Sequence, residues 1–387
     1  MAAVRIASGL AARDAGVDSF AEAASRAQLG LGGAPADLVA VFAATANLDS
    51  VESGLASVEA RLRPRALMGC GAQGVLGGGR ELEQGGVVVW AASLGDGEAE
   101  SFHLEPMPAG DDGIVIAGVP ELDGADAVIM LADPYSFPIE PLLAQMGEDF
   151  PGLPVIGGLA SARRDDEGCV LMHDHAVAHS GAVGAVLRGV DVRACVSQGA
   201  RPIGPEMTIT AAEGNVVHEL ASRPALVRLR EAITELDPQE RVLAGNGLLL
   251  GLVIDGNRPE YERGDFLVRG LVDVDDETGS VTVGDYVRVG QTARLQVRDG
   301  ASADEDLRAV LGRQLHELTV PPVGALVFTC TGRGVGMFGE PDHDAVAIEH
   351  AWGSVAAAGF FCAGEIGPVG RRNFLHGFTA TMAVFPG

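Results

Sequence analysis

The stretch that decides the fold is Gly359–Gly377, which reads GFFCAGEIGPVGRRNFLHG. Two large apolar residues and a cysteine lead into closely spaced glycines, and a carboxylate, two arginines, an asparagine and a histidine follow. We expect a strand that ends in an irregular glycine-rich loop, because glycines at this spacing disfavour regular structure. Such strand ends bind small ligands in α/β proteins. The earlier stretch Leu67–Gly79, LMGCGAQGVLGGG, has the same character, which indicates a duplicated binding fold.

Three segments of the chain share one order of elements. Each has an apolar strand, an amphipathic helix, a strand that ends in small residues, and a further strand. They predict an α/β fold with mixed β-sheets, built from repeated βαβ(β) units with flanking helices. Internal duplication and chance likeness among such units both account for the pattern. The segments are 37–94, 127–189 and 324–385.

The sequence between the second and third segments has a different periodicity. Residues 207–220 alternate around a turn, which predicts a hairpin, and Pro224 predicts the start of a helix. Strand-like runs from 248 to 298 predict an antiparallel meander in the second half of the chain. We therefore expect a strand–helix extension, an N-terminal domain and a C-terminal domain, at residues 1–36, 37–221 and 222–387.

Charge and composition exclude several functions. The chain has 387 residues and a net charge of −26, and all 27 of its basic residues are arginines. Without lysine there is no P-loop lysine, no lysine Schiff base for a pyridoxal cofactor and no kinase-type lysine. Strong acidity also opposes binding to nucleic acids and to anionic membranes, because cationic patches supply most of that affinity. We expect neither as a partner.

The cysteines and the apolar runs indicate a cytoplasmic protein. Five cysteines lie mostly beside apolar strands and form no CxxC motif, which predicts free thiols in a reducing compartment. No run approaches the about 18 apolar residues of a membrane span, and the N-terminus has no long apolar core. The cysteines are Cys70, Cys169, Cys195, Cys330 and Cys362.

Three blocks of the sequence together resemble the FIST family. They are SQGARPIG (Ser197–Gly204), GRGVGMFGEPDHD (Gly332–Asp344) and GFFCAGEIGPVGRRNFLHGFTA (Gly359–Ala380). The resemblance covers roughly residues 37–385 and implies an N-terminal and a C-terminal FIST domain. It also implies a small-ligand-binding sensory module of signal transduction. Because no output domain fits in the residues before Asp37, we expect signalling in trans to a separate partner.

Charged and thiol side chains form the predicted ligand site of the second half. Cys330 and Cys362 end two strands that we expect to be neighbours, so both thiols should lie at one edge of a sheet. Arg333 lies in a GRG loop and suits a bidentate contact with a carboxylate or phosphate. Glu365 suits an ammonium group. A cation, an anion and nearby amides around one opening are typical of a site for an amino-acid-like metabolite.

The remaining predicted ligand contacts are uncharged or weakly basic. Two lie on the segment that returns after Glu365, and four lie at the glycine-rich strand ends of the first half, where the backbone approaches a ligand closely or merely packs. They are Asn373 and His376, and Gly69, Cys70, Gly158 and Ser161.

Each of these residues also has a plainer structural interpretation. The two cysteines can be small core residues, and Arg333 can pair with Asp342. Glu365 can accept hydrogen bonds from the N–H groups of its own loop, and His376 can be a core histidine. Ligand binding and internal packing therefore stay open for every member of the site.

Beside a scaffold whose acidic face recruits an arginine-rich partner, two other functions stay open. One is a cysteine-dependent enzyme, with Cys362 as nucleophile and His376 or Glu365 as base. The other is a haem- or metal-dependent sensor, with His218, His376 or a cysteine as the axial ligand. The sequence has no GxSxG, HExxH, dinucleotide or CxxCH motif, and residues 173–179, HDHAVAH, are more typical of a solvated hairpin than of a metal site. We predict no catalytic residue, no metal and no cofactor.

Overall fold

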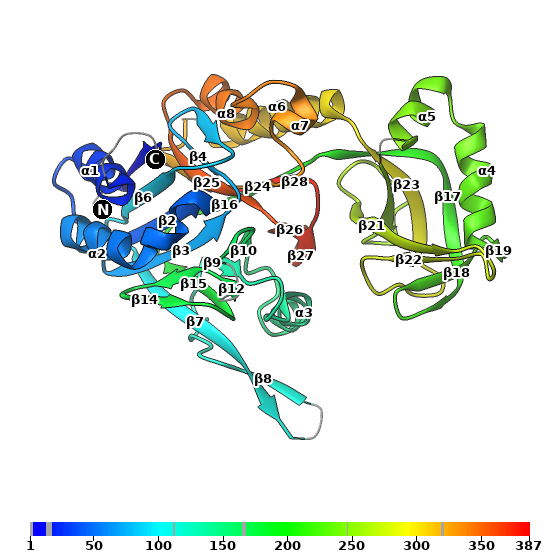
Figure 1. Ribbon diagram of the computed structural model, residues 1–387, viewed down its shortest axis with the longest axis horizontal. Coiled ribbons are helices and arrows are strands. Elements are labelled where there is room, and N and C mark those ends of the chain that lie inside the picture. Colours follow the sequence, from blue (N-terminus) through cyan, green and yellow to red (C-terminus); the bar gives the residue numbers. More distant parts are fainter. Residues whose placement is uncertain (1–2, 13–17, 111–112, 165–167, 246, 319–320) are drawn as a thin grey trace. The chain divides into compact units, whose positions relative to one another are not determined.

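The computed structural model describes residues 3–12, 18–110, 113–164, 168–245, 247–318 and 321–387 (Figure 1). These residues form two compact units. The first contains Met1–Val196, Leu307–Leu375 and Ala380–Gly387, and the second contains Ser197–Asp306 and His376–Thr379. The chain therefore leaves the first unit, builds the second and returns. The domain division expected at residue 221 stays a prediction.

Three repeats of one βαββ motif build the first unit, which confirms the predicted α/β fold with mixed sheets. In each repeat a helix joins two parallel strands, and a later strand pairs antiparallel with the first of them. The first repeat is β2 (Leu38–Ala44), α2 (Val51–Leu62), β3 (Ala66–Ala72) and β6 (Val87–Ser93). The second is β9 (Ala127–Ala132), α3 (Ile139–Asp149), β10 (Val155–Leu159) and β15 (Ala182–Arg188). The third is β24 (Gly324–Cys330), α8 (His343–Trp352), β25 (Ala356–Cys362) and β28 (Thr379–Phe385).

Each repeat gives a hairpin to the sheet of another repeat. The hairpin of the first repeat pairs with β25, that of the second with β3, and that of the third with β10. The exchange is cyclic, so none of the three sheets is complete without residues of another repeat. The hairpins are β4–β5 (Val75–Gly77 and Arg80–Leu82), β13–β14 (Leu171–His173 and Ala176–Ala178) and β26–β27 (Glu365–Val369 and Arg372–His376).

A further strand precedes each repeat and lies beside its last strand. These strands are β1 (Arg5–Ala11) beside β6, β7 (Glu98–Ala109) beside β15, and β16 (Arg193–Gln198) beside β28. Within the described ranges, no helix is both long enough and apolar enough to cross a membrane. The remaining elements are α1 (Ser19–Leu31), η2 (Thr45–Ser50), β8 (Gly113–Ala117), β11 (Arg163–Arg164), β12 (Gly168–Cys169), α6 (Gly300–Leu318) and α7 (Val335–Phe338).

An inner apolar core joins the three sheets of the first unit. The strands of the repeats are buried on both faces, as their continuous apolar sequences predict. On the inner faces, the ring of Phe42 from the first repeat lies 4.9 Å from that of Phe360 and 6.4 Å from that of Phe328 in the third. Three outer clusters cover the other faces, one for each sheet. The helices visible around the sheets in Figure 1 close these outer clusters.

One glycine recurs at the same place in the second strand of every repeat. A Cβ atom on Gly69, Gly157 or Gly359 would lie 2.2, 1.8 or 1.7 Å from a carbonyl oxygen of the parallel neighbouring strand. No side chain fits at that distance, so close strand approach requires glycine at all three positions. This recurrence supports internal duplication over chance likeness.

The expectation of an irregular glycine-rich loop after Cys362 is wrong. Residues 365–376 form the regular hairpin β26–β27, and its turn contains Gly370 with φ of 61°. The glycines supply the turn and the close contacts between strands rather than an open loop. Gly364, for example, accepts a hydrogen bond from the N–H of Leu159 at 2.8 Å.

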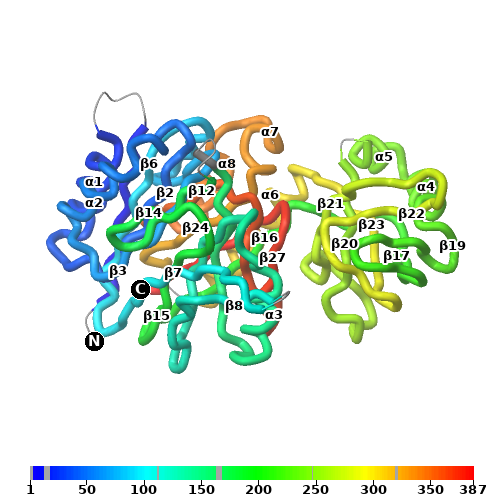
Figure 2. Tube along the Cα trace, turned by 60° about the horizontal axis from the view of Figure 1, so that its bottom comes forward, coloured from blue at the N-terminus to red at the C-terminus, as the bar shows by residue number. Residues whose placement is uncertain are grey.

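The second unit is an antiparallel sheet with two helices. The strands at 248–253, 266–275 and 280–283 are neighbours in chain order, as the predicted meander requires. The strand at 292–298 was also expected in the meander, but it pairs with the strands at 200–213 and 248–253 instead. The strand order of the sheet is β17-β23-β20-β21-β22-β18-β19, and the unit's own apolar core lies among these strands and α4. In Figure 2 the unit can be followed by its green and yellow tube. Its elements are β17 (Ala200–Glu213), β18 (Val216–Leu220), β19 (Arg223–Pro224), α4 (Ala225–Glu235), α5 (Pro238–Gly245), β20 (Leu248–Val253), β21 (Phe266–Asp275), β22 (Ser280–Val283) and β23 (Thr292–Arg298).

Candidate functional site

The second strands of the three repeats end at a common place, which we call the strand junction (residues 70–74, 158–161 and 360–365). Backbone hydrogen bonds join the repeats here. The N–H of Phe361 donates to the carbonyl oxygen of Gly74 at 3.0 Å, and the N–H of Ala363 donates to that of Leu159 at 3.0 Å. Cys330 and Cys362 are register partners on β24 and β25, as expected. The glycine-rich strand ends of the first and second halves, which were predicted as two sites, therefore meet at the strand junction.

Buried thiols occupy the strand junction. Cys70 and Cys362 are fully buried, and a Cβ atom on Gly158 would lie 2.4 Å from the Sγ of Cys362. Burial raises the pKa of both thiols, and the charge of Glu365 raises the pKa of Cys362 further. Both side chains are therefore protonated thiols at neutral pH. Gly158 leaves the space that the sulfur of Cys362 fills.

The hydroxyl of Ser161 links all three repeats. It donates a hydrogen bond to the carbonyl oxygen of Phe361 in the third repeat, and it accepts one from the N–H of Gln73 in the first, at 2.8 Å. A serine that makes both contacts holds the strand ends together. Its position at the junction agrees with the grouping predicted from the sequence, and its role as a ligand contact stays a prediction.

Arg333 makes a buried bidentate ion pair with Asp344. Its Nε and Nη2 donate to the two carboxylate oxygens at 2.7 and 2.8 Å, and Thr329 donates to the same carboxylate at 2.7 Å. Burial by itself would raise the pKa of Asp344, but the charge and hydrogen bonds of Arg333 hold that pKa well below its usual range. The carboxylate partner considered from the sequence was Asp342, and that choice is wrong. Asp344, on the first turn of α8, was not among the predicted partners.

Aromatic and imidazole rings cover this ion pair. The ring of Phe338 stacks on that of His343 with a centroid distance of 3.4 Å, and the guanidinium of Arg333 lies 5.1 Å from the Phe338 centroid. Nδ1 of His343 lies 2.9 Å from Asp344. Among the described residues, Nη1 of Arg333 has no hydrogen-bond partner although it is buried. The two N–H groups of Nη1 are thus not used by the part of the chain that the structure describes.

The other predicted contacts divide between the junction and more distant places. Glu365 is fully buried at the junction, pairs in register with Gly158, and contributes to the raised pKa of Arg333. Asn373, on β27, lies next to the start of β10, and its Oδ1 accepts a hydrogen bond from the N–H of Val155 at 2.9 Å. The structure does not bring Asn373 to the junction, and His376 belongs to the second unit.

A cavity of about 640 Å³ is lined by Val335, two residues after Arg333, and by Glu81, which feels the charge of Asp344. Glu83 lines it, and its Oε1 accepts a hydrogen bond from the N–H of Val335 at 2.8 Å. Gly334 lies between this cavity and the junction, because a Cβ atom there would be 2.6 Å from Glu83 and 3.2 Å from the Phe361 ring. The lining residues are Ala12, Glu81, Leu82, Glu83, Gln84, Gly85, Val335 and Pro341.

The carboxyl group of Glu81 is buried between this cavity and α8. Its Oε1 accepts a hydrogen bond from the N–H of Ala345 at 3.0 Å. Burial, and then the charge of Asp344, raises the pKa of Glu81 to about 7. Glu81 and Glu83 were missed by the sequence reasoning, because the exchange of hairpin β4–β5 into the third sheet is not visible in the sequence.

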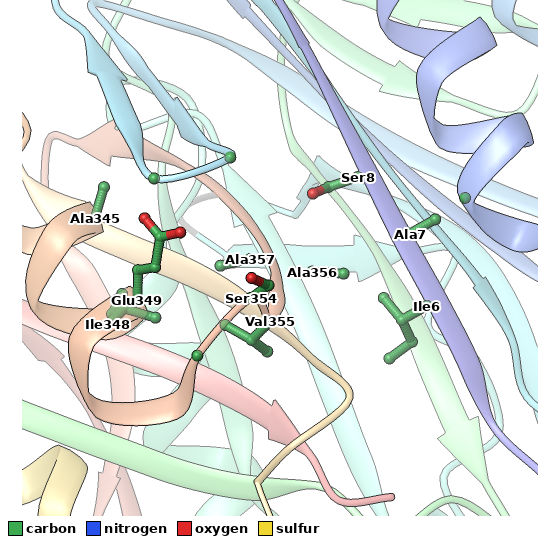
Figure 3. A pocket seen from close by; sticks show the side chains of 14 residues that line it. Ile6, Ala7, Ser8, Ala345, Ile348, Glu349, Ser354, Val355, Ala356 and Ala357 are labelled. Atoms are coloured by element: carbon green, nitrogen blue, oxygen red, sulfur yellow. The ribbon is translucent and has the colours of Figure 1, made fainter.

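A second cavity, of about 310 Å³, contains none of the predicted site residues. Figure 3 shows Ile6, Ala7 and Ser8 of β1 on one side of it and Ile348 and Glu349 of α8 on the other. Over the part of the chain that the structure describes, no three His, Cys, Asp or Glu side chains are grouped so that they could hold a metal ion.

Comparison with known proteins identifies the family. The FIST N domain matches residues 37–223, and the FIST C domain matches residues 225–368. An uncharacterized protein of Mycobacterium tuberculosis is 44% identical over 366 residues, which are 94% of this chain and 95% of that protein. An uncharacterized protein of Mycobacterium bovis is 42% identical over 365 residues, which are 94% of each chain. This chain therefore belongs to the FIST family, whose domains are associated with sensory signal transduction.

Proposed function

We propose that this chain is a cytoplasmic sensory protein that binds an amino-acid-like metabolite and signals to a separate partner protein. The observation that carries the proposal is the cavity of about 640 Å³ whose wall contains the carboxylates of Glu81 and Glu83. Its volume falls within the range of about 300–1,000 Å³ typical of small-ligand sites. Membership in a family associated with sensory signalling supports the same function.

The charges around the cavity support an amino-acid-like ligand. The Glu83 carboxylate on the cavity wall suits an ammonium group. Nη1 of Arg333 has no hydrogen-bond partner among the described residues and suits a carboxylate on the same ligand, although Arg333 is buried behind the cavity lining and is not part of it. Cys362 and Glu365 of the strand junction, and Cys330 at the end of β24, stay proposed ligand contacts.

The alternative of a cysteine-dependent enzyme has weaker support. A nucleophilic cysteine acts as the thiolate, and catalytic cysteines usually have a lowered pKa and some exposure. Burial instead raises the pKa of Cys362, which disfavours the thiolate that such an enzyme would need. A haem- or metal-dependent sensor stays an alternative, and the visible absorption spectrum of freshly purified protein distinguishes it.

A thermal-shift screen with free amino acids and their close derivatives tests the proposal. A ligand at 100 times its dissociation constant adds about 2.7 kcal/mol to the free energy of unfolding, which is a readily measured rise in melting temperature. The variant Glu83→Gln should lose this rise, whereas Glu98→Gln, on the exposed part of β7, should keep it. A broad library without any stabilising compound would contradict ligand sensing, and an unchanged rise in Glu83→Gln would place the ligand elsewhere.

A further inference from the structure

A β-ribbon extends from the first unit and presents apolar side chains to solvent. We call it the arm, and it consists of residues 105–109 of β7 and 113–117 of β8. Met107, Ile114 and Val115 are 53%, 62% and 56% exposed. Figure 1 shows the arm reaching beyond the other strands and helices of its unit. A two-stranded ribbon is marginally stable by itself, and exposed apolar residues on it indicate an interaction surface.

Proline residues determine which edge of the arm is open. Pro106 and Pro108 have no N–H group, so they cannot belong to the hydrogen-bonded pairs with β8, although they lie opposite Ile116 and Ile114. The hydrogen bonds within the arm must therefore be made by the alternate residues of each strand. It follows that Ile114 and Ile116 direct their N–H and C=O groups away from β7. The outer edge of β7 is blocked by proline, and the outer edge of β8 is open.

We propose that two copies of this chain associate through antiparallel pairing of their β8 edges. The sequence of β8, GIVIA, is symmetric about Val115 in size and apolar character. Pairing centred on Val115 places each Ile114 opposite the partner's Ile116. The N–H and C=O groups of Ile114 and Ile116 face outward. Within β8, only this register gives both residues hydrogen-bond partners on both copies. A two-fold axis through the contact makes the interface self-complementary.

Side chains agree with the same register. Met107 and Val115 are directly opposite each other within the arm and lie on one face. Pairing about Val115 extends this face across both copies. Four apolar side chains then lie in one row: Met107, Val115, the partner's Val115 and the partner's Met107. β-branched and other apolar cross-strand pairs stabilise sheets.

The absence of charge on the arm lets two copies of this acidic chain approach each other at the β8 edge. The net charge of −26 makes most surfaces of two copies repel each other. Residues 106–109 and 113–117 carry no charge, so the proposed pairing places no like charges opposite each other. Because β8 is the last strand in its sheet, the pairing also joins the two sheets into one continuous sheet.

Engineered cysteines test both the association and its register in the full-length protein. All five natural cysteines are buried, so a surface cysteine is a specific probe. Val115→Cys should form a disulfide-linked dimer under mild oxidation, because non-hydrogen-bonded antiparallel pairs bring Cα atoms to about 4.5 Å. The control Val242→Cys, on α5 and similarly exposed, should stay monomeric on a non-reducing gel.

Charge variants test whether the partner is a second copy. Sedimentation velocity should show a dimer for the natural chain and a monomer for Val115→Glu and for Val115→Arg, because each variant places like charges opposite each other. An equal mixture of the two variants should regain the dimer. A monomeric natural chain at micromolar concentration, or a dimer that survives in both single variants without cross-linking at position 115, would overturn the proposal.

Discussion

At the scale of single residues, the Arg333–Asp344 pair should be the most sensitive interaction of the site. Asp344→Asn leaves a buried guanidinium without its counter-charge, so we expect a loss of about 3–5 kcal/mol in the free energy of unfolding. The exposed pair of Arg193 with Asp191 provides the control, and Asp191→Asn should cost less than about 1 kcal/mol. Urea denaturation at neutral pH measures both, and equal small losses would contradict the structural importance of the buried pair.

Glu81 should make stability depend on pH near neutrality. Burial and the charge of Asp344 raise its pKa from 4.5 to about 7, so the folded protein holds this proton more tightly than the unfolded chain. Stability should therefore fall as the pH rises from 4.5 through 7. In Glu81→Gln this fall should be smaller by up to about 3 kcal/mol, and Glu98→Gln should behave as the natural chain. Parallel pH profiles of melting temperature for all three proteins would exclude the effect.

At the scale of elements, the recurring glycine sets the distance between paired strands. Gly359→Ala would place a methyl group 1.7 Å from the carbonyl oxygen of Val327, so β24 and β25 would have to separate. We expect a loss of at least about 3 kcal/mol or failure to fold. Gly147→Ala, in α3 with open space around it, should instead gain about 0.5–1 kcal/mol. Thermal melts compare the variants, and an unchanged melting temperature in Gly359→Ala would show that the strands adapt.

At the scale of the whole molecule, the cyclic exchange of hairpins makes the first unit a single folding unit. Residues 1–196 lack hairpin β26–β27 and the entire third repeat, so their fragment should not unfold cooperatively. Co-expression with residues 307–387 should restore its solubility. Residues 197–306 contain the main core of the second unit and should fold alone. Circular dichroism melts of the fragments test this, and a cooperative transition in 1–196 alone would contradict it.

The sequence predicted more of the fold than of the site. Periodicity placed α2, α3 and α8 and the parallel strand pairs, because apolar stripes and short buried strands are local signals. It also placed Cys330 beside Cys362. The carboxylates of the cavity wall, Glu81 and Glu83, were not predictable, since their hydrogen-bond partners Ala345 and Val335 lie about 250 residues later in the chain. The partner of Arg333 is only 11 residues away, but Asp342 and Asp344 are similarly near in sequence, and only the fold decides which of them faces the guanidinium.

By itself the sequence determined the three repeats, the glycines that let their strands approach, and the acidic, lysine-free character that excludes several chemistries. Only the tertiary structure decided which sheet each hairpin completes and which carboxylate neutralises Arg333. The physical reason is that secondary structure follows from neighbouring residues, whereas a hairpin has the same local pattern whichever strand edge it joins. That choice is made by the burial of apolar faces and of paired charges across distant segments, and no local pattern contains it.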